Sequence, residues 1–224
     1  MSVDFTKEWL IVCEGDADRT FFNELILKRG LPDFQVRFPG RKGDESGGWT
    51  KYGRYLDEIK LNEGFIKNVK AILVVGDNDD DPATRFTEIQ EQIRQAGGYG
   101  IPDAELRVAR SANNLPDIVI MMLPLNGQPG NLEHCLIPAA LSKWPDLEAP
   151  LEEYIRCSPA SGWPERKKSK TRMQCILAAT CRQDPNTSLS WLWGRPDEYH
   201  IPLDNACFDE VANILQGFGN IIAR

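Results

Sequence analysis

The chain has 224 residues, a formal net charge of −7 and a sequence pI of about 5.0. This length suits one large domain with a substantial core, and the 42% of hydrophobic residues is ordinary for a globular protein. The acidic balance excludes a general electrostatic attraction to nucleic acid or to anionic membranes. Binding of a polyanion would therefore need a local basic patch or a bound metal.

Membrane and secretion signals are weak in the sequence. The longest apolar run, residues 118–125, is much shorter than the roughly 20 residues of a transmembrane helix. The first ten residues lack the basic and apolar regions of a signal peptide. Six cysteines without a CxxC pair indicate reduced thiols rather than disulfides or a zinc site. We therefore expect a cytoplasmic protein with no membrane partner.

The first acidic cluster, EGDAD, follows an apolar run at residues 8–13 that predicts a buried strand. A helix is predicted from Asp16 to about residue 28. Glu14 at a strand end can serve as an acid, a base or a metal ligand, and Gly15 permits close approach of a substrate. Alternatively, Glu14 is a solvated strand end and Asp18 is a helix-capping acid favoured by the helix dipole.

Residues 34–38 (FQVRF) alternate in the manner of a strand. The glycine-rich segment 39–48 follows and is predicted to be a flexible connector, in which Arg41 and Lys42 form a weak basic feature. A second helix is predicted over residues 52–61.

The second acidic cluster, DNDDD, follows the clearest central strand, predicted over residues 69–75. Alternate residues of an extended segment point the same way, so Asp77 and Asp79 would present oxygens to one Mg²⁺, with Asp81 close behind. Carboxyl ends of parallel strands share one crevice, where this cluster and Glu14 would meet. Such carboxylates repel one another unless a cation compensates. The alternative is an acidic turn favoured by the dipole of the next helix.

The remaining pattern predicts the fold class. A helix over residues 82–96 and strands over 106–109 and 117–123 complete an alternation typical of an α/β protein with a mostly parallel sheet flanked by helices. We expect this domain to cover residues 1–130 and a helical C-terminal extension, residues 131–224, to pack on it. The helical patterns of the extension begin at Asn131 and cover residues 151–156, 166–181 and 207–215.

Two features of the extension are chemically suggestive. Glu133, just after the predicted cap Asn131, would complete a second metal site if its helix packs against the crevice; otherwise the helix dipole explains it. Residues 159–170 are predicted to form an exposed loop that runs into a basic helix start. The run 166–172 (RKKSKTR) would hold a phosphate backbone or stabilise negative charge, although most such runs are solvated faces.

The order EGxxD after one strand and DxD after another resembles the Toprim domain of topoisomerases, bacterial primases and OLD-type (overcoming lysogenization defect) nucleases. The segments DRTFF at residues 18–22 and GG at residues 47–48 resemble small standalone Toprim-like proteins related to those nucleases. The resemblance covers residues 8 to about 140 and implies a Toprim-like, Rossmann-like sheet. It implies a metal site with Glu14, Asp77 and Asp79, joined by a further glutamate that Glu133 resembles.

The resemblance also implies a lysine beside the metals, which Lys168 or Lys170 would provide. Two departures stand out. Pro82 follows the acidic pair where topoisomerases and primases commonly show DxDxxG, and the sequence has no GxxxxGK[ST] phosphate loop for an OLD-type ATPase domain.

The preferred hypothesis is phosphodiester chemistry on DNA or RNA, nuclease-like and dependent on Mg²⁺ or Mn²⁺, in defence or repair. An alternative is a non-catalytic Toprim-fold binding or regulatory protein that acts with a protein partner or as a homo-oligomer. A third is an aspartate phosphotransferase of the receiver or haloacid-dehalogenase type, which has no role for Glu14. In the preferred hypothesis, the catalytic residues are Glu14, Lys168 and Lys170, and the metal ligands are Glu14, Asp18, Asp77, Asp79, Asp81 and Glu133.

Overall fold

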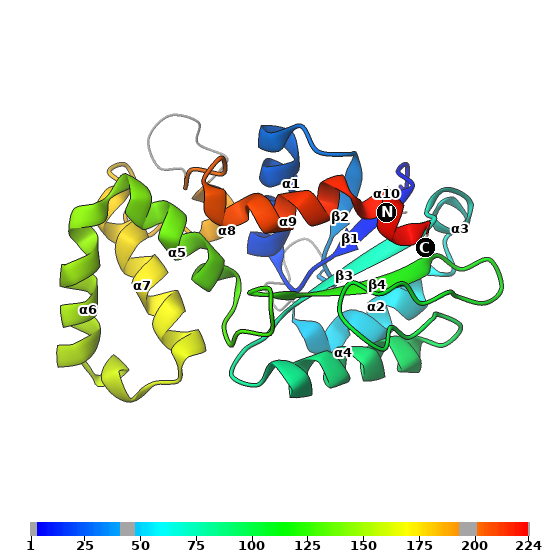
Figure 1. The fold of residues 1–224 in the computed structure, drawn as a ribbon, viewed down its shortest axis with the longest axis horizontal. Coiled ribbons are helices and arrows are strands. Elements are labelled where there is room, and N and C mark those ends of the chain that lie inside the picture. The colour runs from blue at the N-terminus through cyan, green and yellow to red at the C-terminus, as the bar shows by residue number, and fades with distance from the viewer. Residues whose placement is uncertain (1–3, 41–47, 193–200, 224) are drawn as a thin grey trace.

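The computed structural model describes residues 4–40, 48–192 and 201–223. Helices cover both faces of one parallel sheet, and α5, α6 and α7 lie to one side of it (Figure 1). The predicted α/β fold class and the helical C-terminal region are confirmed. The α-helices in these residues are α1 (Asp16–Arg29), α2 (Tyr52–Ile59), α3 (Glu63–Asn68), α4 (Pro82–Ala96), α5 (Leu132–Lys143), α6 (Glu148–Cys157), α7 (Glu165–Thr180), α8 (Leu189–Leu192), α9 (Asp209–Gln216) and α10 (Phe218–Ile222).

The sheet has four parallel strands in the order β2-β1-β3-β4. Trp9 at the start of β1 lies opposite Phe34 of β2 and Ala71 of β3, and Ala71 lies opposite Asp117 of β4. The four strands therefore begin at the same level, and their carboxyl ends lie at the same edge. The strands are β1 (Trp9–Val12), β2 (Phe34–Arg37), β3 (Ala71–Asp77) and β4 (Asp117–Leu123).

Each strand contributes to two apolar cores because successive side chains point to opposite faces. On β3, Leu73 and Val75 pack in the core that also contains residues of α1, α5 and α9. Ile72 and Val74 pack in the core on the other face, with residues of α2, α3 and α4. Since both faces are covered, the central strands are apolar throughout rather than alternating.

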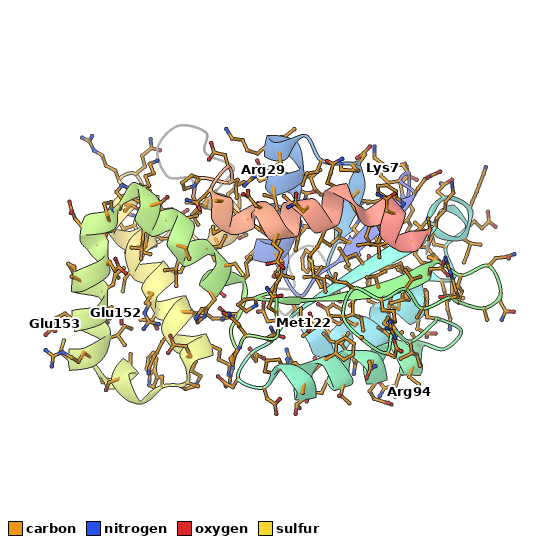
Figure 2. The ribbon with its side chains drawn as sticks, in the orientation of Figure 1. Lys7, Arg29, Arg94, Met122, Glu152 and Glu153 are labelled. Carbon is orange, nitrogen blue, oxygen red and sulfur yellow. The ribbon has the colours of Figure 1, made fainter. Side chains whose placement is uncertain are left out.

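The C-terminal segment returns over the face of the sheet that α1 covers, where α9 and α10 run above the strands (Figure 1). Arg29 at the end of α1 holds this segment in place, and it is labelled in Figure 2. Its guanidinium donates to the backbone oxygens of Leu203 and Asn205 at 2.7 Å and pairs with Asp209 at 2.8 Å. The last helices are thus tied both to α1 and to the sheet.

The strand order creates a topological switch point at the carboxyl edge of the sheet, the position of the ligand crevice in open α/β sheets. From β1 the chain crosses to β2 on one side, whereas from β3 it crosses to β4 on the other side. The loops after β1 and β3 therefore diverge, and ligands of open α/β sheets bind at such a switch point. Glu14 follows β1 and Asp77 ends β3, so both acidic clusters begin at this crevice.

Two sequence predictions were wrong in detail. Residues 106–109 form no strand. Ala109 makes an isolated antiparallel bridge with Ile118, and the N–H of Leu106 donates to the backbone oxygen of Ile120 at 2.9 Å, but the left-handed conformation of Leu106 (φ 57°) keeps the two contacts from joining into one strand. Much of the predicted loop at 159–170 is helical, because a 3-10 helix covers Pro159–Gly162 and α7 begins at Glu165; the basic run lies on α7, as the helical pattern over residues 166–181 predicted.

Within the described residues, no helix combines the length and the apolar character that a membrane crossing requires. The predicted connector at residues 39–48, with Arg41 and Lys42, lies largely outside the described residues.

The close packing of α2 on α4 gives a test of the fold. A Cβ atom on Gly53 would lie 2.7 Å from the backbone oxygen of Gln92. We expect Gly53→Ala to lower the free energy of unfolding by about 1 kcal/mol, and by no more than about 2 kcal/mol, since overpacking costs about 1–3 kcal/mol and alanine regains roughly 1 kcal/mol of helix propensity. Urea unfolding measures the difference. Gly162→Ala is the control, because a Cβ there meets nothing within 4 Å; equal unfolding midpoints for both variants would contradict the packing.

Candidate functional site

The carboxyl ends of β1 and β3 bring the two acidic clusters into contact. The backbone N–H of Asp77 donates to Oε1 of Glu14 at 3.1 Å, across 63 residues of sequence. Glu14 is held further by the loop that precedes α2, because the N–H of Gly48 donates to its backbone oxygen at 2.8 Å. The predicted convergence of the clusters is present, and it follows from adjacent parallel strands that end at one edge.

Asp18 joins the site from the first turn of α1. Its Oδ2 accepts a hydrogen bond from the backbone N–H of Gly15 at 3.1 Å, so it caps the helix that follows β1. Asp18 is thus a helix-capping acid, and the charges of Glu14 and Glu133 act on its carboxylate.

The start of α5 points at Asp77. The backbone N–H of Leu132, in the first turn of α5, donates to Oδ1 of Asp77 at 3.0 Å. The first N–H groups of a helix have no acceptor within the helix, and the helix dipole favours a carboxylate at this end. This contact places the next residue, Glu133, beside the strand-end carboxylates, with 15% of its side chain exposed.

The loop after β3 is held by Asn78, which the sequence interpretation did not single out. This fully buried side chain donates from Nδ2 to the backbone oxygens of Pro124 at 2.6 Å and Gln128 at 2.7 Å. Beyond it, Asp79 and Gly130 exchange both backbone hydrogen bonds at 2.7 Å. The loops after β3 and β4 therefore form one unit, and the second of them leads directly into α5.

We expected from the sequence that Asp79 would continue an extended segment after Asp77, and this prediction was wrong. Its φ of 49° is left-handed, a conformation that aspartate tolerates better than most residues. The side chain of Asp79 is consequently not oriented in the same way as that of Asp77. Its Oδ2 lies 3.2 Å from Nε of Arg85.

Arg85 is the main residue of the site that sequence reasoning missed. It lies on α4, and its side chain is only 8% exposed. Its Nη2 lies 3.3 Å from Oε1 of Glu14, and its Nη1 lies 3.2 Å from Oε2 of Glu88. In the sequence, Arg85 has the pattern of a surface residue of an amphipathic helix, so no local signal identified it.

Lys170 supplies a second cation, from α7. Its Nζ lies 3.8 Å from Oε1 of Glu133, and the side chain is 60% exposed. Asn131 fixes α7 against α5: its Oδ1 accepts from Oγ of Ser169 at 2.9 Å, and its Nδ2 donates to the backbone oxygen of Arg166 at 2.9 Å. The predicted elements around Glu133 and Lys170 are therefore packed together.

Two other predicted residues lie differently. Asp81 is exposed and caps α4, where it accepts hydrogen bonds from the backbone N–H and the hydroxyl of Thr84. These bonds lower the pKa of Asp81. Lys168 lies 3.9 Å from Glu165 on its own helix rather than beside the strand-end carboxylates. In the part of the chain that the structure describes, no three Asp, Glu, His or Cys side chains are arranged to hold one metal ion together.

The electrostatics of the site follow from carboxylates crowded in a poorly solvated crevice. Burial, then the charges of Glu14 and Glu133, raise the pKa of Asp18 to about 7. Burial, followed by the charges of Glu14, Asp18 and Glu133, raises the pKa of Asp77 well above its ordinary range. Burial also raises the pKa of Glu14, and Arg85 offsets only part of this rise.

The negative charge of the same carboxylates also shifts the pKa of Lys170, which is a cationic group. Burial alone would lower the pKa of this ammonium group, but the surrounding carboxylates outweigh that effect and raise it. The ammonium therefore stays charged. The carboxylates that act on it are those of Glu133, Asp77, Asp18 and Glu14.

Comparison with protein families identifies one match. Residues 8–217 match the family described as "Protein of unknown function (DUF3226)". The chain belongs to this family. The matched region spans the sheet, the candidate site and most of the C-terminal helices of this DUF3226 protein. No curated protein and no solved structure matches the chain at a significant level.

The raised pKa of Asp18 predicts a pH-dependent stability. Its pKa of about 7 exceeds its ordinary value of 3.8, so between these pH values the native state binds more protons than the unfolded chain and stability falls as pH rises. In chelator-treated protein at pH 7.5, we expect Asp18→Asn to raise the melting temperature by roughly 3 °C, the effect of about 1 kcal/mol in a chain of this size.

The gain should shrink at pH 5, where Asp18 is largely protonated in the folded protein. Asp16→Asn is the control, because Asp16 lies in the same helical turn but pairs with Arg19 at the surface. Thermal unfolding followed by circular dichroism at both pH values provides the measurement. A melting temperature of Asp18→Asn below that of the unsubstituted protein at pH 7.5 would contradict the assignment.

Proposed function

We propose that this protein carries out phosphodiester chemistry on nucleic acid, nuclease-like and dependent on Mg²⁺ or Mn²⁺, as the Toprim-like motifs suggest. The observation that carries the proposal is the contact of Glu14 with Asp77 at the carboxyl edge of the sheet, close enough to Glu133 at the start of α5 for the charge of Glu133 to act on Asp77, with Lys170 beside Glu133. A crowded set of carboxylates at this position favours a divalent cation. We place the activity in the cytoplasm, in defence or repair.

The donor chemistry of the crevice fits a hard cation, since its ligands are carboxylate oxygens. Asp77 and Glu133 would hold the metal. Glu14 and Asp79 would also bind it once their ion pairs with Arg85 are broken. A bound metal would polarise a phosphoryl oxygen and stabilise charge that develops on it. The raised pKa values of Asp77 and Glu14 support this proposal, because a cation relieves the repulsion that raises them.

The remaining groups have roles that follow from their charge. Asp18, with a pKa of about 7, would exchange a proton with the attacking water or the leaving oxygen near neutral pH, and Glu14 shares its environment. The ammonium of Lys170, exposed at the rim beside Glu133, would neutralise charge on the phosphate. On an acidic chain, such local cations are what would attract a phosphate backbone.

A second candidate function is a non-catalytic nucleic-acid-binding or regulatory protein that acts with a protein partner or as a homo-oligomer. The observation that favours it is that Arg85 already pairs with Glu14 and Asp79, so part of the negative charge is neutralised without a metal. This alternative predicts little binding of Mg²⁺ and no turnover.

The proposal is tested by incubating the protein with single- and double-stranded DNA and RNA, in the presence of Mg²⁺, Mn²⁺ or a chelator. We expect metal-dependent cleavage that Asp77→Asn reduces by about 100-fold, a loss typical of a residue that stabilises transition-state charge. Asp103→Asn is the control, since Asp103 is exposed and pairs with Arg107. Circular dichroism confirms that the variants are folded. Equal cleavage by Asp77→Asn and the unsubstituted protein would sink the assignment, and the lack of both metal binding and cleavage would favour the regulatory alternative.

A further inference from the structure

Arg85 is a cation set inside the carboxylate cluster. Its guanidinium lies 3.3 Å from Glu14 and 3.2 Å from Asp79, which come from the loops after β1 and β3. Because the Arg85 side chain is only 8% exposed, solvent and salt screen these pairs weakly. In this structure, the guanidinium therefore supplies positive charge to two carboxylates that the proposed function assigns to the metal.

The guanidinium also has a partner nearer to solvent. Its Nη1 lies 3.2 Å from Glu88, one turn further along α4, whose side chain is 37% exposed against 18% for Glu14. The planar fork of an arginine matches the oxygens of a phosphate and makes paired, charge-assisted hydrogen bonds to it. Arg85 is thus placed to contact either the carboxylates of the site or an anion that arrives at it.

A guanidinium and a divalent cation cannot both occupy the space between Glu14 and Asp79 without strong repulsion, because like charges at such distances interact strongly in a poorly solvated crevice. Oε1 of Glu14 already faces Arg85 and accepts from the N–H of Asp77. This arrangement accounts for the lack of a three-ligand metal shell among the described residues: two of the carboxylates are turned toward Arg85.

We propose that Arg85 is an internal competitor of the metal, so that the guanidinium and the divalent cation bind Glu14 and Asp79 in a mutually exclusive way. Substrate phosphate draws the guanidinium away and thereby strengthens metal binding. This inference rests on the proposed function, because it concerns the same metal site. It makes Arg85 a residue that couples loading of the metal to the presence of a phosphodiester.

The test is a calorimetric titration with Mn²⁺ of the unsubstituted protein and of Arg85→Gln. We expect Arg85→Gln to bind Mn²⁺ about tenfold more tightly, a coupling typical of two ligands linked through one site. Dimethyl phosphate, a soluble diester, should tighten Mn²⁺ binding to the unsubstituted protein and leave Arg85→Gln unchanged. Arg94→Gln is the control: Arg94 lies at the C-terminal end of the same helix (Figure 2), and it is 55% exposed and pairs with Glu91.

Removal of a buried cation can unfold the metal-free protein, so Arg85→Lys is measured in parallel. Lysine keeps the charge but cannot bridge two carboxylates with a fork, and we expect its Mn²⁺ affinity to exceed that of the unsubstituted protein. If neither variant binds Mn²⁺ more tightly than the unsubstituted protein, while Asp77→Asn abolishes binding, the inference is overturned and the proposed function stands. If no form binds Mn²⁺, both are overturned.

Discussion

The hydrogen bond from the backbone N–H of Leu132 to Oδ1 of Asp77 joins the sheet to the C-terminal helices at the candidate site. It spans 55 residues of sequence and satisfies one of the helix-end N–H groups that α5 cannot satisfy internally. Together with the bonds of Asp79 to Gly130 and of Asn131 to α7, it fixes the start of α5 and the position of Glu133. Yet the pKa of Asp77 is still raised, which means that burial and like charges outweigh the favourable helix end.

The charge balance of the crevice explains how protons, side-chain cations and a metal become linked. Acidic groups outnumber basic ones, so any group that neutralises the excess negative charge stabilises the site. Such a group is a proton on Asp18, the guanidinium of Arg85, or a divalent cation in the proposed function. Each of these reduces the benefit of the others, because all act on the same carboxylates. The acidic groups are Glu14, Asp18, Asp77, Asp79 and Glu133, and the basic groups are Arg85 and Lys170.

Sequence reasoning succeeded where a rule of strand or helix geometry decides the outcome. The meeting of Glu14 and Asp77 needs only two adjacent parallel strands, and the bounds of α4 at residues 82–96 follow from a proline at its start and glycines after its end. Sequence reasoning failed where contacts between distant parts of the chain determine the position of a side chain. Arg85 reads as a surface residue of an amphipathic helix until the crevice buries it, and no local pattern reveals the left-handed backbone that turns Asp79 aside.

The framework around these charges is built from neutral amides. Asn78 binds the loop after β4 through two backbone oxygens, and Asn131 binds α7 through Ser169 and the backbone oxygen of Arg166. Both asparagines are fully buried, so their hydrogen bonds exchange little with water. Amide side chains do not titrate, and these bonds therefore persist over the pH range in which Asp18 changes its charge. The crevice is consequently able to gain or lose protons without losing the loops that define it.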